Sequence, residues 1–319
     1  MYFFIDGLFT DESEAKLSIL DLGILRGYGI FDYLRTYKGH PFHLKEHLER
    51  LFYSAKKTGL TLPYSLPEIE TILFKLISLS GYEECSIKIL VTGGISSDQM
   101  ITSEKSSFIA FAYPLKPYPA THYTNGIKTI TTRLERPLPC SKTTQYLPAI
   151  VALKEGLQTG ASEALYVNNK EEILEATTSN FFAFKQGVLI TPPENGILLG
   201  ITRAVILKLC ENKFPIEIRP ILYQEITEFD EAFVSASNKE VMPVIKIDTF
   251  SIGTGQVGPL TQEVMNLFVT YTASQKEMPL FISRYEITSN EDLEKLSTGE
   301  FSIDLAKKHE NETFLKKIN

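Results

Sequence analysis

The amino-acid sequence predicts an α+β fold in two domains. Short apolar runs bounded by turn residues follow one another directly, as in antiparallel strands, and helical patterns lie between these groups instead of after every strand. Three prolines between residues 113 and 123 give that segment the composition of a linker. Because 319 residues exceed the usual size of one core, we expect a small α/β domain (1–117), a larger domain (118–274) and a charged extension of unknown role (275–319).

The first domain reads as strands followed by two helices and two further strands. Alternating apolar runs and turn residues predict a strand meander over residues 1–37. Apolar residues then recur at helical spacing and Gly59 is placed to end that helix; they are Leu44, Leu48, Leu51 and Ala55. A second helix is predicted over 67–81, and apolar runs predict strands over 86–94 and 107–115.

The second domain reads as hairpins with three helices placed among them. A strand over 127–132 is followed by a helix over 147–159, which Gly160 would cap. Four short apolar runs separated by NNK, TTSN and KQG predict antiparallel hairpins over 164–168, 171–176, 181–184 and 188–191. Further patterns predict a helix over 200–213, strands over 232–236 and 244–250, and a helix over 260–273.

Composition and charge restrict the class of partner. The formal net charge of −7 provides no basic field for a polyanion, so nucleic acid is not an expected partner. No apolar run approaches the roughly 18 residues of a membrane span, and the first ten residues lack a positively charged leader. Three scattered cysteines without CxxC spacing argue against disulfides and structural zinc. These features predict a cytoplasmic protein.

Two local motifs suggest ligands that their contexts do not support. His40, His43 and His47 include a pair four residues apart, but Pro41 lies between them and no further ligand cluster follows, so zinc is rejected. The sequence GTGQVG, residues 253–258, matches GxGxxG and would make this a non-enzymatic dinucleotide-binding protein. Too little chain follows it for repeated βα units, and a loop leading into a helix started by Pro259 is the better interpretation.

Several polar residues would suit an aromatic phosphate cofactor. Gly200, Ile201 and Thr202 open a helix, whose free N–H groups can bind phosphate. The hydroxyl-rich bend 235–238 could add donors, and Arg50 could add charge, although taken alone it reads as a solvated helix arginine.

Lys142 and Glu175 are each open to two interpretations. Lys142 lies in a polar bend and is either a solvated charge or a Schiff-base lysine. Glu175 ends a predicted strand and is either an exposed edge residue or a carboxylate directed at a cationic ring nitrogen.

Five stretches in order resemble the class IV, or fold type IV, pyridoxal-phosphate aminotransferases, which include branched-chain and D-amino acid aminotransferases and aminodeoxychorismate lyase. The stretches are DLGILRGYGIFDYLRTYKGHPFHLKEHLERL, SKTTQYLPAIVALKEGLQTGASEALYV, LEATTSNFFAF, GITR and FVSASNKEVMPV. They span about residues 1–274. The resemblance implies a C-terminal pseudo-barrel, pyridoxal 5'-phosphate as cofactor, and a homodimer.

The resemblance also implies roles for individual residues. Lys142 is the Schiff-base lysine and proton carrier, and Glu175 pairs with the pyridine nitrogen, which keeps the ring an electron sink. Leu198 packs against one face of the ring. The residues that would hold the phosphate are Arg50, Ile201, Thr202 and Ser237. Tyr146 lies four residues after the lysine where some members have a tyrosine five after it, so its contact with the cofactor stays open.

The sequence departs from the family at the substrate carboxylate. D-amino acid enzymes place an arginine and a histidine where an ungapped alignment puts Asp98 and Met100, and branched-chain enzymes place a tyrosine where this chain has Arg26. We therefore expect Arg26 and Lys88 as a substitute anion-binding pair, with Lys88 on a solvated strand face as the other interpretation. A D-amino acid aminotransferase is predicted, with a branched-chain L-amino acid enzyme and then aminodeoxychorismate lyase as alternatives.

Overall fold

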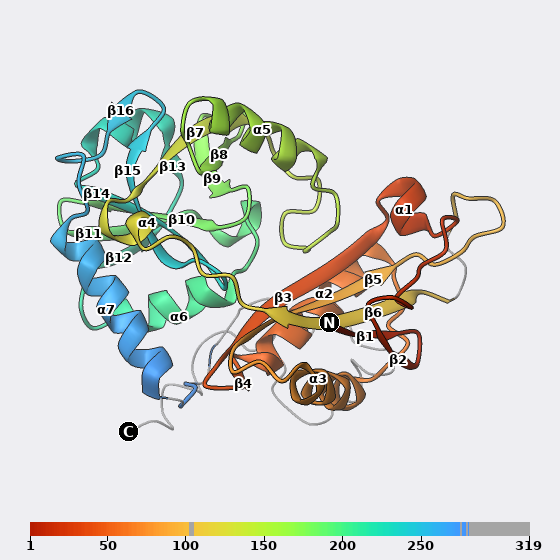
Figure 1. The fold of residues 1–319 in the computed structure, drawn as a ribbon. Coiled ribbons are helices and arrows are strands. Elements are labelled where there is room, and N and C mark those ends of the chain that lie inside the picture. Colours follow the sequence, from red (N-terminus) through yellow and green to blue (C-terminus); the bar gives the residue numbers. More distant parts are fainter. Residues whose placement is uncertain (102–104, 275, 279, 281–319) are drawn as a thin grey trace, which may run out of the picture.

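The computed structural model describes residues 1–101, 105–274, 276–278 and 280. Two groups of strands, each with its own helices, lie side by side and are joined by the segment between β6 and α4 (Figure 1). The predicted extension over 275–319 falls almost entirely outside the described residues. No helix of the described chain is long and apolar enough to cross a membrane.

The N-terminal group is a six-stranded antiparallel sheet in the order β2-β1-β6-β5-β3-β4. The strands are β1 (Tyr2–Ile5), β2 (Leu8–Asp11), β3 (Gly29–Tyr37), β4 (His40–Pro41), β5 (Cys85–Thr92) and β6 (Ser107–Pro114). Its helices are α1 (Leu22–Arg26), α2 (Leu44–Thr58) and α3 (Leu66–Ser80). The two predicted helices and the strands over 86–94 and 107–115 are confirmed, and Gly59 ends α2 in the left-handed conformation with φ 74°.

The predicted meander over residues 1–37 is wrong in one part, because α1 interrupts it. The Asp21 side chain accepts a hydrogen bond from the backbone N–H of Gly23 at 2.6 Å, and Gly27 ends the helix with φ 63°. An N-cap aspartate and a C-terminal glycine therefore define a helix of five residues, too short to show an apolar period.

The N-terminal sheet has one face in the core and the opposite face turned away from α2 and α3. Alternate residues of β3 and β5, such as Ile30, Leu34 and Ile89, are buried with the apolar sides of α2 and α3. The residues between them, including Phe31 and Lys88, are on the opposite face. The strand period thus places Lys88 away from the helices.

The C-terminal group contains ten strands and forms a pseudo-barrel. The strands are β7 (Ile127–Arg133), β8 (Glu163–Val167), β9 (Glu172–Ala176), β10 (Asn180–Lys185), β11 (Val188–Thr191), β12 (Ile216–Ile218), β13 (Ile221–Leu222), β14 (Glu231–Ala236), β15 (Glu240–Ile247) and β16 (Phe250–Ser251). Pairing runs β10-β14-β15-β7-β8-β9, and the single pair Glu175–Asn180 joins β9 back to β10. A ring of six strands is therefore closed at one residue pair.

Helices cover the outside of this ring. They are α4 (Thr121–Thr124), α5 (Leu147–Gln158), α6 (Ile201–Cys210) and α7 (Pro259–Ser274), with 3₁₀ helices over Glu194–Gly196 and Tyr223–Glu228. The predicted hairpins are confirmed, although β9 and β10 share only the closing pair. The sequence did not indicate α4, β12 or β13, which have two to four residues each. The α+β class with a C-terminal pseudo-barrel is confirmed.

The GxGxxG motif forms the loop between β16 and α7, and Pro259 begins the helix as expected. The Glu231 carboxylate accepts hydrogen bonds from the backbone N–H groups of Leu260 (3.0 Å) and Thr261 (2.6 Å). A carboxylate of the protein itself therefore occupies the start of α7, where a dinucleotide-binding protein would bind pyrophosphate.

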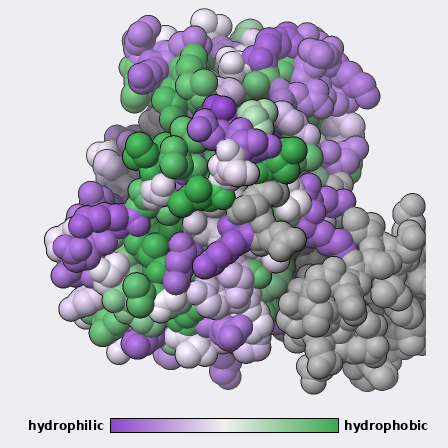
Figure 2. Space-filling model, turned by 90° about the vertical axis from the view of Figure 1, so that its right-hand side faces the viewer, coloured by the Kyte–Doolittle hydropathy of each residue, from purple (hydrophilic) through white to green (hydrophobic). Residues whose placement is uncertain are grey.

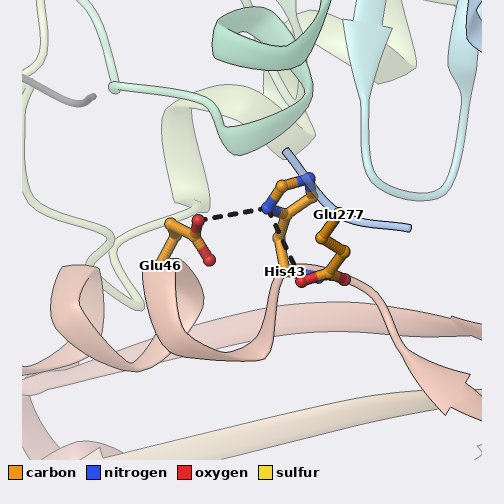
Figure 3. A group of neighbouring side chains, drawn as sticks. All are labelled: His43, Glu46 and Glu277. Atoms are coloured by element: carbon orange, nitrogen blue, oxygen red, sulfur yellow. Dashed lines mark hydrogen bonds and ion pairs between the residues drawn. The ribbon is translucent and has the colours of Figure 1, made fainter. Parts of the chain in front are cut away.

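The three histidines of residues 40–47 do not converge on one point. His40 is exposed, and His47 contacts Asp32 in the interior. His43 precedes α2, and Glu46 and Glu277 lie beside its ring (Figure 3). Its Nε2 is 2.8 Å from the Tyr271 hydroxyl and its Nδ1 is 3.2 Å from Glu46, so both ring nitrogens have protein partners.

Glu277 completes the cluster around His43 from the segment after α7. Its carboxylate accepts a hydrogen bond from the backbone N–H of His43 and lies 3.9 Å from Nδ1. The backbone N–H of Met278 donates to the Tyr271 hydroxyl at 2.9 Å. These bonds tie the segment after α7 to the start of α2.

Replacing Glu231 by alanine should lower the free energy of unfolding by about 1–2 kcal/mol, because two N–H groups of α7 lose their acceptor. Urea unfolding of Glu231→Ala and of Glu211→Ala, whose carboxylate makes only a surface ion pair with Lys208, provides the comparison. Equal losses in the two variants would contradict the capping role.

Candidate active site

A cavity of about 420 Å³ lies where the outer face of the N-terminal sheet meets the pseudo-barrel. Residues of β3 and β5 line one side, and residues of β9, β14 and the start of α6 line the other. All of the predicted site residues except Arg26 line it: Arg50, Lys88, Lys142, Glu175, Leu198, Ile201, Thr202 and Ser237. Tyr146, whose position the sequence left open, also lines the cavity.

Lys142 is held by its backbone on the N-terminal sheet. Its N–H donates to the Ser54 hydroxyl at 3.1 Å, and its carbonyl accepts from the N–H of Phe31 at 2.9 Å. Nζ lies 4.5 Å from the centroid of the Phe31 ring. Burial and the nearby charge of Arg50 lower the pKa of Lys142 to about 7. A substantial fraction of the amine is therefore neutral at pH 7, which a nucleophile or a proton acceptor requires.

Glu175 is the buried carboxylate of the cavity, with 5% of its surface exposed. Oε2 accepts a hydrogen bond from the backbone N–H of Leu198 at 3.0 Å. Oε1 accepts two from Arg136, at 2.9 Å from Nε and 2.6 Å from Nη2. The interpretation of Glu175 as an exposed edge residue is therefore wrong.

Arg50 is likewise buried and does not have the solvated position that its sequence alone suggests. Its Nε and Nη2 each donate to the Asp32 carboxylate at 2.8 Å, and Nη1 donates to the Leu199 carbonyl at 3.2 Å. Burial opposes the ionisation of Asp32, but the charges of Arg50 and His47 outweigh it and hold the pKa of Asp32 well below its ordinary value. The bidentate pair fixes the guanidinium at the cavity wall.

One end of the cavity has the features of a phosphate site. Gly200 precedes α6, and neither an acidic residue in the first turn nor a side-chain cap satisfies the first N–H groups. The hydroxyls of Thr202 and Ser235 are buried without a hydrogen-bond partner in the described chain. A Cβ on Gly200 would lie 2.0 Å from Oδ1 of the Asn180 side chain, so the close approach of these two segments requires glycine. Ser237 lines the same wall.

Lys88 lies on the cavity face of β5, so its assignment to a solvated strand face is wrong. Burial lowers its pKa, and no carboxylate of the described residues lies within ion-pair distance. Nζ is 5.7 Å from the centroid of the Phe31 ring. Tyr33 and Tyr113 line the cavity beside it, and the Tyr33 hydroxyl is 2.9 Å from the Ser86 hydroxyl.

Arg26 lies outside the cavity, which corrects the expectation that it lines the pocket of its own chain. It is the last residue of α1, is exposed, and donates from Nε to the Gln99 carbonyl at 3.1 Å. Asp98 and Met100 are also exposed and are not lining residues. The short helix α1, absent from the predicted meander, turns the Arg26 side chain toward this loop.

Other residues near the cavity were not indicated by the sequence. Arg136 and Tyr166 line it, and Asp32 and His47 hold Arg50 from behind. The sequence places Asp32 in a predicted strand and His47 three residues before Arg50. Neither position reveals that the strand and the helix are in contact. Burial raises the pKa of Tyr146 to about 12, so its hydroxyl keeps its proton at pH 7.

Residues 29–247 match the family model described as amino-transferase class IV. The chain belongs to this family. The protein is therefore an aminotransferase that uses pyridoxal phosphate and acts on amino acids and oxo acids.

Relatives with two different substrate names resemble the chain to a similar degree. D-alanine aminotransferase of Staphylococcus aureus is 34% identical over 85% of this chain and 98% of the relative. A Methanocaldococcus jannaschii protein, provisionally named a branched-chain-amino-acid aminotransferase, is 32% identical over 84% of this chain and 95% of its own length. The structure of Escherichia coli branched-chain amino acid aminotransferase is 25% identical with a TM-score of 0.82, covering 86% of this chain and 96% of that one.

Removing the Thr202 hydroxyl should weaken pyridoxal-phosphate binding without destabilising the apoprotein. Thr202→Val deletes a buried hydroxyl that has no partner in the described chain, so the unfolding midpoint of the apoprotein should not change. The Kd for the cofactor should rise about tenfold, the effect of losing one hydrogen bond. Thr261→Val removes another such buried hydroxyl, at the start of α7 and outside the cavity lining. A rise in Kd of the same size in both variants would contradict the assignment.

Proposed function

We propose that this class IV aminotransferase moves an amino group between a D-amino acid and a 2-oxo acid, and that Lys88 binds a substrate carboxylate. The supporting observation is the cavity wall around Lys88, where a cation without a carboxylate partner in the described chain stands beside the hydroxyls of Tyr33 and Tyr113. A half-buried cation such as Lys88, without a counter-ion in the described chain, favours an anionic ligand. The similarity to D-alanine aminotransferase agrees with this choice.

The cavity residues fit pyridoxal phosphate in their chemistry. The orphaned hydroxyls and the uncapped helix start provide donors for a phosphate, and a buried carboxylate provides the acceptor that a protonated ring nitrogen needs. An amine with a lowered pKa lies on the opposite wall. In this proposal Arg50, Ile201, Thr202 and Ser237 hold the phosphate, and Leu198 packs on the ring.

When bound, pyridoxal phosphate supplies a ring that accepts the electron pair left by the departing α-proton. Lys142 would hold the cofactor through its amine, and the released Nζ would serve first as the base that takes the α-proton and then as the acid that delivers it in the 1,3-proton shift. The Glu175 carboxylate keeps the ring nitrogen protonated. Phe31 covers Nζ and limits the access of water to the amine.

A branched-chain L-amino acid is the second candidate donor. Phe31 and Leu90, which face each other across β3 and β5 next to Lys88, provide apolar surface that an aliphatic side chain could contact. The Methanocaldococcus relative supports this alternative. Because Lys142 takes the α-proton from the same wall in both cases, the two candidates differ in the placement of their carboxylate and side chain, so they are separable by donor stereochemistry.

A half-reaction screen with D-alanine, D-glutamate and L-leucine separates these donors. We expect the cofactor absorbance to change fastest with a D-donor, and Lys88→Met should lower kcat/KM for it by at least about tenfold, the effect of losing one charge-assisted bond. The Kd for pyridoxal phosphate should not change. Lys128→Met, at an exposed lysine of β7, is the matched control, and preference for L-leucine would refute the proposed donor.

The domain division and the cellular location are also proposals. Separate sheets and separate cores support domains over 1–117 and 118–274. Cys85, Cys140 and Cys210 are buried and form no disulfide, which supports a cytoplasmic location.

We also propose a homodimer that uses the surface around α1. Hydrophobic residues gather on this side of the molecule (Figure 2). The loop 93–101 lies against α1, since Leu22 N–H donates to the Gly94 carbonyl at 2.9 Å. The two segments, with the residues just before α1, expose Ile19, Leu20, Ile24, Ile95, Met100 and Ile101. A continuous apolar surface of this kind is typical of a protein interface.

Light scattering coupled to size-exclusion chromatography should give twice the chain mass for the wild type. Ile24→Lys should shift the mass toward that of one chain, because it places a charge in the apolar surface. Leu157→Lys, at an exposed leucine of α5, should remain a dimer. A wild-type mass of one chain at micromolar concentration would rule out the homodimer.

A further inference from the structure

The guanidinium of Arg136 contacts Glu175 and the bend that carries Lys142. It lies in the segment between β7 and α5 and lines the cavity. Nε and Nη2 donate to Oε1 of Glu175 at 2.9 and 2.6 Å. Nη1 donates at 3.1 Å to the carbonyl of Ser141, the residue before Lys142, and Nη2 donates to the carbonyl of Pro139. One planar group therefore joins a barrel strand to the bend that carries the lysine.

We propose that Arg136 is the positioning residue that fixes the Glu175 carboxylate relative to the bend carrying Lys142. The inference rests on the roles proposed above for Lys142 and Glu175. Glu175 is on β9 of the C-terminal sheet, whereas the bend at Lys142 is hydrogen-bonded to β3 of the N-terminal sheet through Phe31. Arg136 makes both connections, to the carboxylate and to the carbonyls on either side of Cys140, through neighbouring N–H groups of one fork.

The charge of Arg136 has a second effect, on the amine. The pKa of Lys142 is lowered first by burial and then by Arg50, and Arg136 adds to this lowering while Asp32 and Glu175 oppose it. Removal of the Arg136 charge would leave the Glu175 carboxylate without its cation, and both changes favour the ammonium form of Lys142. The pKa of Lys142 should then rise, and less neutral amine would be present at pH 7.

Two substitutions separate the charge of Arg136 from its shape. Arg136→Gln removes the charge and the fork, whereas Arg136→Lys keeps a cation but cannot bond the carboxylate and two carbonyls together. The matched control is Arg133→Gln, three residues earlier, where an arginine with 59% side-chain exposure pairs with Glu171 at the surface. Circular dichroism establishes that each variant is folded.

The first measurement is the rate at which trinitrobenzenesulfonate modifies Lys142 in the apoprotein, followed by peptide mass mapping across pH. Only the neutral amine reacts, so the profile reports the pKa of Lys142. In Arg136→Gln the profile should move to higher pH by about one unit, which is about tenfold slower modification on its acid side. In Arg136→Lys and Arg133→Gln it should match the wild type. Glu175→Gln should move it to lower pH.

The second measurement is the Kd for pyridoxal phosphate, which reports the geometry of the site. It should rise about tenfold in both Arg136 variants, for the loss of one charge-assisted interaction, and stay unchanged in Arg133→Gln. A folded Arg136→Gln with a wild-type profile would overturn the inference, as would an Arg136→Lys with wild-type affinity. If Arg136→Gln does not fold, the affinity of Arg136→Lys decides.

Borohydride reduction of the wild-type holoenzyme distinguishes failure of this inference from failure of the proposed roles. Cofactor mass attached to a residue other than Lys142 would remove the basis of the proposed function. Cofactor mass on Lys142, with Arg136 variants that do not change either measurement, would remove only the role of Arg136.

Discussion

The structure depends on the way in which the strand ring of the C-terminal group closes. Five of its contacts are strand pairings, but β9 meets β10 at Glu175 and Asn180 alone. The chain around Leu198 fills the gap that follows: its N–H donates to Glu175 at 3.0 Å, and its carbonyl accepts from Asn180 at 2.8 Å. Glu175 and Leu198, which meet at this closing point, both line the cavity.

The cavity concentrates positive charge in a protein of negative net charge. Arg50, Arg136, Lys88 and Lys142 all line it, while Glu175 is the only carboxylate among the lining residues. Burial, together with the charges of Arg50 and Arg136, lowers the pKa of Lys142 and keeps its amine partly neutral. The same surplus attracts a cofactor phosphate and the carboxylates of amino and oxo acids. One electrostatic arrangement therefore serves binding and the protonation state of the amine.

Sequence patterns predicted the elements whose formation depends on neighbouring residues. The leucine spacing and Gly59 were sufficient for α2, whereas α1, with five residues, was too short to have a period. Arg50 illustrates the limit: its helix was predicted, but its burial depends on Asp32, which is on another element. The predicted position of Arg26 in the cavity was wrong for the same reason, because its side chain is bonded to the distant loop at Gln99. The resemblance supplied Lys142 and Glu175, and only the fold shows Arg136 between them.

The hydrogen bonds around His43 give the far end of the chain a connection to the cavity. Glu277, just after α7, bonds the backbone N–H that opens α2, and the same helix carries His47 and Arg50 further along. A helix moves largely as a rigid rod. Glu277 is thus linked through α2 to the arginine proposed to hold phosphate, and a substitution at Glu277 can alter cofactor retention without touching the cavity.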